Sequence, residues 1–335
     1  MFLTSSIPHV AAGNAAHCAS TLTHPLYALG QVLRQHRYRF VTPTPATIAR
    51  VNERPGNEQA RDLAGIFGWN RPFSAEIAPA PVLDALRAAD AVEQVDGKLR
   101  SKLRVSSIGE QLYFHSAYPT TPDDAVFFGP DTYRFVRQLQ LALPSMGAAL
   151  QRCADIGCGS GAGAIALALA CPNAVIHALD INAAALKLTS VNAALAGVAN
   201  VIAEYSDLLH NVGGEFDLIV ANPPFLVDRD ERAYRHGGGP LGGALSLAIV
   251  DAAIERLTPG GTLLLYTASA IVDGVDALRD EALARLQNGG LVASYEELDP
   301  DIFGEELEEP AYARTDRIAA VWLKATKPMT PRVQP

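Results

Sequence analysis

The stretch Asp-Ile-Gly-Cys-Gly-Ser-Gly at residues 155–161 decides the fold of this 335-residue chain. It follows a short apolar run and precedes an Ala- and Leu-rich segment at 162–170 that has the length of a helix. Gly157, Gly159 and Gly161 permit a tight turn and a close approach between the backbone and a ligand. The pattern is typical of a strand, a glycine-rich turn and a helix at the crevice of an α/β sheet.

Apolar segments alternate with Ala- and Leu-rich helical segments beyond residue 152. The segments expected to be strands are 153–156, 175–180, 201–205, 218–221, 262–266, 291–297 and 318–324. Strand–helix alternation of this length predicts a doubly wound, mainly parallel, Rossmann-like α/β sheet of seven strands. We expect this domain to occupy residues 151–326.

The first part of the chain has a different character, with short helical patterns separated by Pro and Gly. Apolar spacing predicts helices within 25–40, 57–67 and 81–91. The period then changes to two, and residues 92–105, with Asp96-Gly97 at the turn, predict a hairpin. These elements indicate a smaller α+β, winged-helix-like domain over residues 1–120. A connector and a helix at 121–150 would join it to the sheet.

Four cations alternate with other residues along the second strand of that hairpin: Lys98, Arg100, Lys102 and Arg104. On a regular strand these side chains would share one face and could follow the phosphates of a nucleic acid. The alternative is the solvated face of a half-exposed sheet.

Composition places the chain among globular proteins, with 49% hydrophobic and 19% charged residues. Its longest apolar runs fall short of the ~20 residues of a membrane-spanning helix, and its N-terminus lacks the basic start of a secretory signal. Cys18, Cys153, Cys158 and Cys171 form no C-x-x-C pair or disulfide framework. These features predict a cytoplasmic protein.

The net charge of −9 is unevenly distributed. Residues 1–146 carry 14 Lys and Arg against 12 Asp and Glu, or +2, and the remainder carries 13 against 24, or −11. The rear half is therefore a poor general binder of polyanions, and we expect any nucleic-acid contact in the front half.

Three features distinguish the ligand classes that use such a glycine turn. The turn alone does not distinguish them, because it also fits a dinucleotide fingerprint. Asp180 would bind ribose hydroxyls in either ligand class. Asp155, however, would repel a pyrophosphate but could meet a cationic group. Asp207 could accept a hydrogen bond from an adenine amine, and the fourth strand ends in Asn222-Pro223-Pro224-Phe225.

In this order and spacing the motifs resemble class I S-adenosylmethionine-dependent methyltransferases, in the branch with an Asn/Asp-Pro-Pro-aromatic signature. This "methyltransferase small" branch includes nucleic-acid amino-group and release-factor glutamine methyltransferases, and the similarity extends over about 128–324. Pro130-Asp131-Thr132 and Asn192 are similar to features of the glutamine enzymes, whereas Phe225 replaces their usual Tyr. The resemblance implies S-adenosylmethionine as cofactor, with contacts from Asp155, Gly157, Gly159, Gly161, Asp180, Ile181, Asp207, Leu208 and Asn222.

The signature suits methyl transfer to nitrogen on a planar group, whose delocalised lone pair makes it a weak nucleophile. The Asn222 side-chain oxygen and the Pro223 carbonyl can accept its two hydrogens, and Phe225 can stack against it. These three are the expected catalytic residues. Further substrate contacts are expected from Phe128, Pro224, Tyr234 and His236. The loop 228–243 is either a substrate lid or a plain connector, and no residue cluster has convincing metal-ligand spacing.

The sequence thus predicts an S-adenosylmethionine-dependent N-methyltransferase. A nucleobase amine in RNA or DNA is the first expected acceptor, a protein glutamine amide the second and a small molecule the third. Two other classes stay open: a nicotinamide-dependent oxidoreductase using the same glycine turn, and a non-catalytic nucleic-acid-binding regulator.

Overall fold

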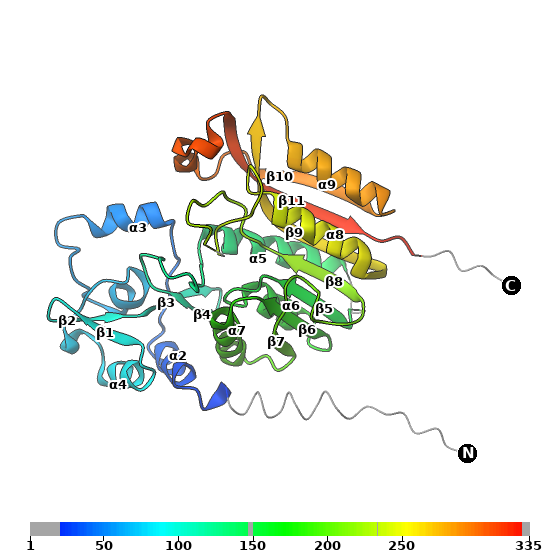
Figure 1. Ribbon diagram of the computed structural model, residues 1–335. Coiled ribbons are helices and arrows are strands. Elements are labelled where there is room, and N and C mark those ends of the chain that lie inside the picture. The colour runs from blue at the N-terminus through cyan, green and yellow to red at the C-terminus, as the bar shows by residue number, and fades with distance from the viewer. Residues whose placement is uncertain (1–20, 147–149, 233, 330–335) are drawn as a thin grey trace, which may run out of the picture.

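The computed structural model describes residues 21–146, 150–232 and 234–329 (Figure 1). Within them, a seven-stranded sheet has the order β10-β11-β9-β8-β5-β6-β7. Pairing is parallel from β7 to β9, and β11 is antiparallel to both of its neighbours. The strands are β5 (Arg152–Ile156), β6 (Val175–Asp180), β7 (Val201–Tyr205), β8 (Phe216–Ala221), β9 (Leu257–Val272), β10 (Val292–Asp299) and β11 (Thr315–Thr326). The predicted mainly parallel α/β sheet is confirmed.

Helices cover both faces of this sheet, as the alternating side chains of β8 show. Leu218 and Val220 belong to the core under α5 and α6, and Ile219 and Ala221 to the core under α8 and α9. The helices are α5 (Pro130–Ala142), α6 (Ala162–Ala170), α7 (Ala183–Ala196), α8 (Ala244–Arg256) and α9 (Ala277–Asn288), with short turns at Leu143–Ser145, Gly304–Glu308 and Pro310–Tyr312. Among the described residues every helix is too short or too polar to cross a membrane.

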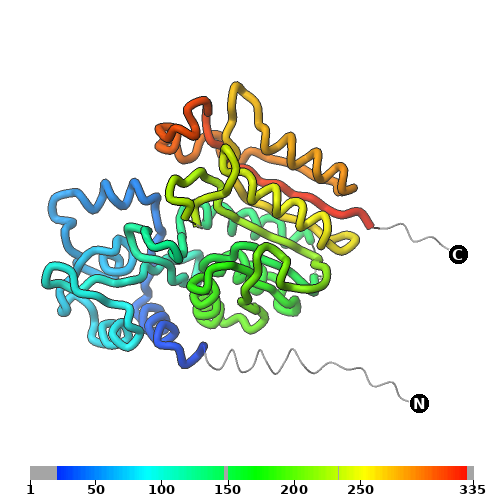
Figure 2. The backbone as a smooth tube through the Cα atoms, viewed as in Figure 1, coloured from blue at the N-terminus to red at the C-terminus, as the bar shows by residue number. Residues whose placement is uncertain are grey.

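The front part of the chain forms a lobe beside α7 (Figure 2). Its elements are α2 (Pro25–Gln35), α3 (Pro45–Asn52), the π-helical turn Ala64–Gly68, the 3-10 turn Ala75–Ile77, α4 (Ala80–Ala88), β1 (Val92–Val95), β2 (Lys98–Ser101), β3 (Leu103–Ile108) and β4 (Gln111–Ser116). The predicted turn at Asp96-Gly97 is confirmed, because both residues have positive φ and Val95 pairs with Lys98. The winged-helix description and the boundaries 1–120, 121–150 and 151–326 stay predictions. Residues 1–20, including Cys18, lie outside the described residues.

Two local predictions in this lobe are wrong. The expected helix 57–67 is reduced to the π-helical turn, because the backbone N–H of Ala60 donates to Pro72 rather than along a helix. The sequence analysis also missed α3, which begins where the Thr44 side chain accepts a hydrogen bond from the N–H of Thr47.

The predicted continuous strand 98–105 is also wrong, and with it the row of cations on one face. The chain leaves β2 at Ser101, whose hydroxyl hydrogen-bonds with the backbone of Leu103, and β3 then pairs with β4 instead of β1. A side chain that bonds its own local backbone competes with the regular ladder, which accounts for the break.

The four cations consequently have different surroundings. Arg104 is 2% exposed and lies in the interior near Tyr38 and Tyr133, where burial lowers the pKa of its guanidinium to about 10. Lys102 pairs with Asp90 at 3.1 Å, and Arg100 donates to the carbonyl of Tyr118. These residues do not form the continuous phosphate track that the sequence suggested.

One buried amide joins the front lobe to the glycine turn. Asn192 of α7 is 0% exposed. Its Oδ1 accepts from the N–H of Phe114 at 2.9 Å, and its Nδ2 donates to the carbonyls of Phe114 and Ser160 at 3.1 and 2.9 Å. A single side chain therefore fixes β4 and the turn at residues 155–161 to the same helix.

We predict that Asn192→Ala lowers the free energy of unfolding by about 3 kcal/mol, because three buried backbone groups lose their partner. Urea titration of wild type and variant measures this difference. Equal denaturation midpoints would show that water or neighbouring groups satisfy the same backbone atoms.

Candidate active site

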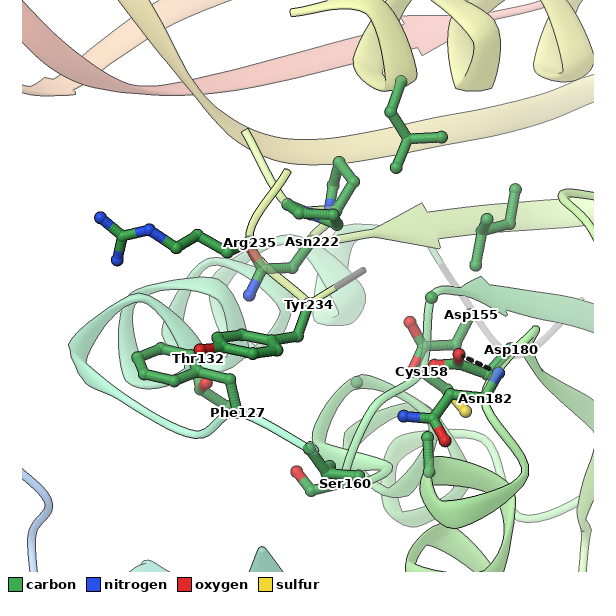
Figure 3. Close-up of a pocket in the computed structure, with 18 of the residues that line it drawn as sticks. Phe127, Thr132, Asp155, Cys158, Ser160, Asp180, Asn182, Asn222, Tyr234 and Arg235 are labelled. Atoms are coloured by element: carbon green, nitrogen blue, oxygen red, sulfur yellow. Dashed lines mark hydrogen bonds between the residues drawn. The ribbon is translucent and has the colours of Figure 1, made fainter. Parts of the chain in front are cut away.

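A pocket of about 240 Å³ opens where β5, β6, β7 and β8 end (Figure 3). The strands continue from β5 toward β7 in one direction and toward β9 in the other. The direction in which strands are added to the sheet therefore reverses at β5. This leaves a crevice beyond the carboxyl ends of the strands, the usual ligand position in such sheets. Residues that follow four different strands thus line one pocket.

The glycine turn shapes the first wall. Gly157, Gly159 and Gly161 have φ values of 69°, 53° and 81°, which favour glycine over other residues. The Gly159 N–H donates to Asp180 Oδ2 at 2.9 Å, and Asp180 Oδ1 accepts from the N–H of Asn182 at 2.9 Å. Gly159 and Gly161 form the turn, whereas Gly157 and Asp180 themselves line the pocket.

Asp155 lies at the base of this wall. It is 2% exposed, and its Oδ2 accepts from the N–H of Ala164 at 2.7 Å, in the first turn of α6. Burial raises the pKa of this carboxyl to about 7, and the nearby Asp180 adds to the effect. A cationic group of a bound ligand would favour its ionised form.

The second wall follows β6 and β7. Ile181 is an exposed apolar residue, and Asp207 has an exposed carboxylate. Leu208, with a positive φ of 48°, lies beside Asp207 in the same pocket. The predicted cofactor residues Asp155, Gly157, Asp180, Ile181, Asp207 and Leu208 are therefore brought together around one space.

The third wall is the segment after β8. Asn222, Pro223, Pro224 and Phe225 all line the pocket. Within the part of the chain that the structure describes, the side-chain amide of Asn222 has no hydrogen-bond partner. It is thus available to a ligand, whereas Asp155 and Asp180 of the first wall each already accept a hydrogen bond from a backbone N–H.

Two predicted substrate residues lie elsewhere. Phe128 is 0% exposed and stacks on His115, with ring centroids 5.1 Å apart, so it belongs to the core. Its neighbour Phe127 lines the pocket instead. His236 is absent from the pocket lining, and its Nδ1 accepts from the N–H of Asp228 at 3.2 Å. We therefore correct both assignments, while Tyr234 does line the pocket.

Sequence reasoning missed several residues of this pocket. Asp131 is buried, accepts from the Tyr266 hydroxyl at 2.6 Å and pairs with Arg134 at 3.2 Å. Burial raises the pKa of Asp131. Its place in Pro130-Asp131-Thr132 was a usable signal. Phe303 comes from the connection between β10 and β11, and no local pattern indicated it.

The loop 228–243 is held by ion pairs at its start. Asp228 is buried and accepts from the backbone and guanidinium of Arg232, which lowers the pKa of its carboxyl to about 2. Arg235, which lines the pocket, pairs with Asp228 and Glu306. The lid interpretation stays a prediction, and opening this loop would require these pairs to separate.

A metal is not indicated, because the described residues contain no cluster of three His, Cys, Asp or Glu side chains suited to one.

Residues 137–280 match the family model of the methyltransferase small domain. This part of the chain is similar to a methyltransferase small domain. The predicted class I membership of the domain and its cofactor type, S-adenosylmethionine, are thereby confirmed.

Several curated proteins are similar to part of this chain. The release factor glutamine methyltransferase of Deinococcus radiodurans is 36% identical over 124 residues, which cover 34% of this chain and 44% of that protein. The protein of the same name from Bordetella pertussis is 35% identical over 170 residues, covering 47% and 61%. Ribosomal RNA small subunit methyltransferase C of Chromohalobacter salexigens is 35% identical over 131 residues, covering 38% and 35%. The chain thus spans about half the length of the curated relatives that it matches.

Among solved structures, a methyltransferase from Pyrococcus furiosus aligns with a TM-score of 0.42 and 18% identity, covering 58% of this chain and 83% of that one.

We predict that Asp155→Asn changes how the stability of the protein depends on pH. Because the pKa of Asp155 is raised from 3.8 to about 7, the folded chain retains a proton that the unfolded chain has lost between these values. The stabilisation from this group therefore falls as pH rises through that window. The free energy of unfolding of the neutral variant should exceed that of wild type by on the order of 1–3 kcal/mol between about pH 5 and 8.

Urea unfolding of both proteins across that range measures the difference. Asn retains an oxygen that can accept from Ala164, so the comparison isolates the ionisation. Parallel stability curves would mean that Asp155 ionises with an ordinary pKa.

Proposed function

We propose that this chain transfers a methyl group from S-adenosylmethionine to the nitrogen of a planar amide or amine, with a glutamine-type amide in a protein as the favoured acceptor. The observation that carries this proposal is the side-chain amide of Asn222 beside Pro223 in the pocket, which has no hydrogen-bond partner among the described residues. Two hydrogen-bond acceptors at this point can bind the two N–H groups of one nitrogen.

The cofactor fits the first two walls by charge and shape. S-adenosylmethionine carries an ammonium and a sulfonium, and the pocket supplies the carboxylates of Asp155, Asp180 and Asp207. Ile181 and Leu208 offer apolar surface for a flat base. When bound, the cofactor supplies an already activated methyl group.

The residues of the third wall then have an orienting task. Hydrogen bonds to the Asn222 side chain and the Pro223 carbonyl would hold the nitrogen with its lone pair directed at the methyl group. The nitrogen would gain the methyl group as the sulfonium C–S bond breaks, leaving S-adenosylhomocysteine, and it would release to water the one proton that becomes acidic once the new bond forms. Alignment of the two reactants accounts for most of the acceleration expected here, and no dedicated base is required.

The charges favour an amide over a nucleobase as acceptor. The nucleobase prediction depended on a cationic strand that the structure divides, with Arg104 in the interior. The pocket contributes Asp155, Asp180 and Asp207, whereas its Arg235 is already paired with carboxylates. Such a surface repels a polyanion. Two of the relatives described above are named release factor glutamine methyltransferases, although a third is named for ribosomal RNA.

Methyl-labelled cofactor and an extract from cells that lack this chain provide the test. We expect macromolecular label that protease removes and nuclease does not, and that acid hydrolysis releases as methylamine, since an amide bond then breaks. Removal by nuclease would instead assign a nucleobase acceptor. Label that mild base releases as methanol would indicate an ester and contradict transfer to nitrogen.

We predict that Asn222→Ala lowers the turnover rate by about 100-fold or more, because its contact strengthens as the nitrogen becomes nucleophilic. The dissociation constant of S-adenosylhomocysteine, measured by calorimetry, should change by less than about threefold, since the carboxylate walls are intact. Near-normal turnover of this variant would make an oxygen or carbon acceptor the better interpretation.

A further inference from the structure

The aromatic residue of the Asn-Pro-Pro-Phe segment is poorly placed to bind a flat substrate. Phe225 is 8% exposed. Its ring packs against Tyr266 and Phe303, with centroid distances of 6.4 and 5.9 Å. Most of its surface is therefore committed to the core, and another residue must provide a stacking surface if the pocket has one.

Phe127 and Tyr234 present such a surface. Both line the pocket and both are only partly buried. Their rings are nearly parallel, with an interplanar angle of 14° and centroids 6.1 Å apart. Figure 3 shows the two rings beside each other near Asn222, with Asp180 and Asn182 on the opposite side of the pocket. The pair thus lies on the side of the pocket where the acceptor would be held.

The surrounding chain fixes both rings. The Tyr234 hydroxyl donates to the carbonyl of Thr120 at 2.7 Å, which joins the loop after β8 to the connector before α5. Phe127 lies over Gly129, where a Cβ atom would be 2.7 Å from the Phe127 ring, so the absence of a side chain there makes room for it. Arg232, itself held by Asp228, lies 5.7 Å from the centre of the Tyr234 ring.

We propose that the paired rings of Phe127 and Tyr234, rather than Phe225, form the surface on which the planar group of the methyl acceptor rests opposite Asn222. This inference depends on the proposed function. A planar amide or amine gains from a flat apolar contact that excludes water and fixes its plane. Because the Tyr234 hydroxyl is bonded to Thr120, the ring contributes its face rather than a hydrogen-bond donor.

The variants Phe127→Leu and Tyr234→Leu test this assignment, with Tyr234→Phe and Phe225→Leu as controls. The probe is the protease-sensitive fraction of the extract described above, titrated against each variant with methyl-labelled cofactor. We expect both Leu variants at the paired rings to raise the half-saturating amount of this fraction about 10-fold or more. Their dissociation constants for S-adenosylhomocysteine should stay within about twofold of wild type. Such binding would also show that the variants are folded.

The controls separate the ring from its hydroxyl and from the core. Tyr234→Phe retains the ring but loses the hydrogen bond to Thr120, so it should raise the half-saturating amount of acceptor less than Tyr234→Leu does. Phe225→Leu removes core packing, so it should lower the melting temperature. It should raise the half-saturating amount of acceptor less than the Leu variants at the paired rings do. If Phe127→Leu fails to bind S-adenosylhomocysteine, Phe127→Met provides a second truncation of the ring with the same expected effect.

The outcomes distinguish this inference from the proposed function. A wild-type protein that transfers no methyl group to nitrogen overturns the proposed function, and the stacking assignment with it. Normal wild-type transfer, together with unchanged acceptor saturation in both Leu variants, overturns the stacking assignment alone. Weaker S-adenosylhomocysteine binding with unchanged acceptor saturation would also overturn it, by assigning the rings to the cofactor.

Discussion

The hydrogen bond between the Gly159 N–H and the Asp180 carboxylate joins the two central features of this protein, the glycine turn and the end of β6. The turn passes through three positive φ values, and the N–H groups of Gly157 and Cys158 also bond to the carbonyl of Leu179. Its backbone donors are therefore satisfied by the neighbouring strand, and α6 can begin immediately after it. Because Asn192 also holds the Ser160 carbonyl, the position of the front lobe depends on the same turn.

The electrostatics of the pocket follow from this arrangement. Parallel strands that end at one edge bring Asp155, Asp180 and Asp207 close together, although 52 residues separate the first from the last. Burial of such groups disfavours their charged forms, which is why the pKa values of Asp155 and Asp180 are raised. The ammonium and sulfonium groups of the cofactor would relieve that cost, whereas a polyanion would increase it. The same charges thus favour a cofactor that carries cationic groups.

Sequence reasoning succeeded where structure is decided locally. Strands β6 and β7 and helix α6 have the predicted bounds, because each strand is a short, mainly apolar run and the glycine turn marks the start of the helix. It failed where a strand has more than one possible partner. Alternation at 98–105 looked like one strand, yet β3 pairs with β4, and a local pattern does not encode that choice.

The same limit explains why the sequence analysis predicted Phe128 at the pocket, where the structure has Phe127. Two adjacent aromatic residues face opposite sides of an extended segment, and the sequence alone leaves the phase open. The two hydrogen bonds between Val126 and Ser116 fix it. They direct Phe128 to the core and Phe127 to the pocket. Which side each ring faces is therefore decided by Ser116, ten positions before Val126, and a local motif does not predict it.

The two sides of the pocket differ in how they are built. The cofactor side consists of short turns directly attached to β5, β6 and β7, whose positions the sheet dictates. The acceptor side is assembled from the connector, the loop after β8 and the Phe303 segment, which are held by the Tyr234–Thr120 hydrogen bond and the Arg235–Glu306 ion pair. Phe303 has a positive φ of 55°, uncommon for a bulky residue, so its neighbours must stabilise it there. Changes in these loops would alter the proposed acceptor side without moving the strands that carry the proposed cofactor side, so the choice of acceptor would be separable from the chemistry of transfer.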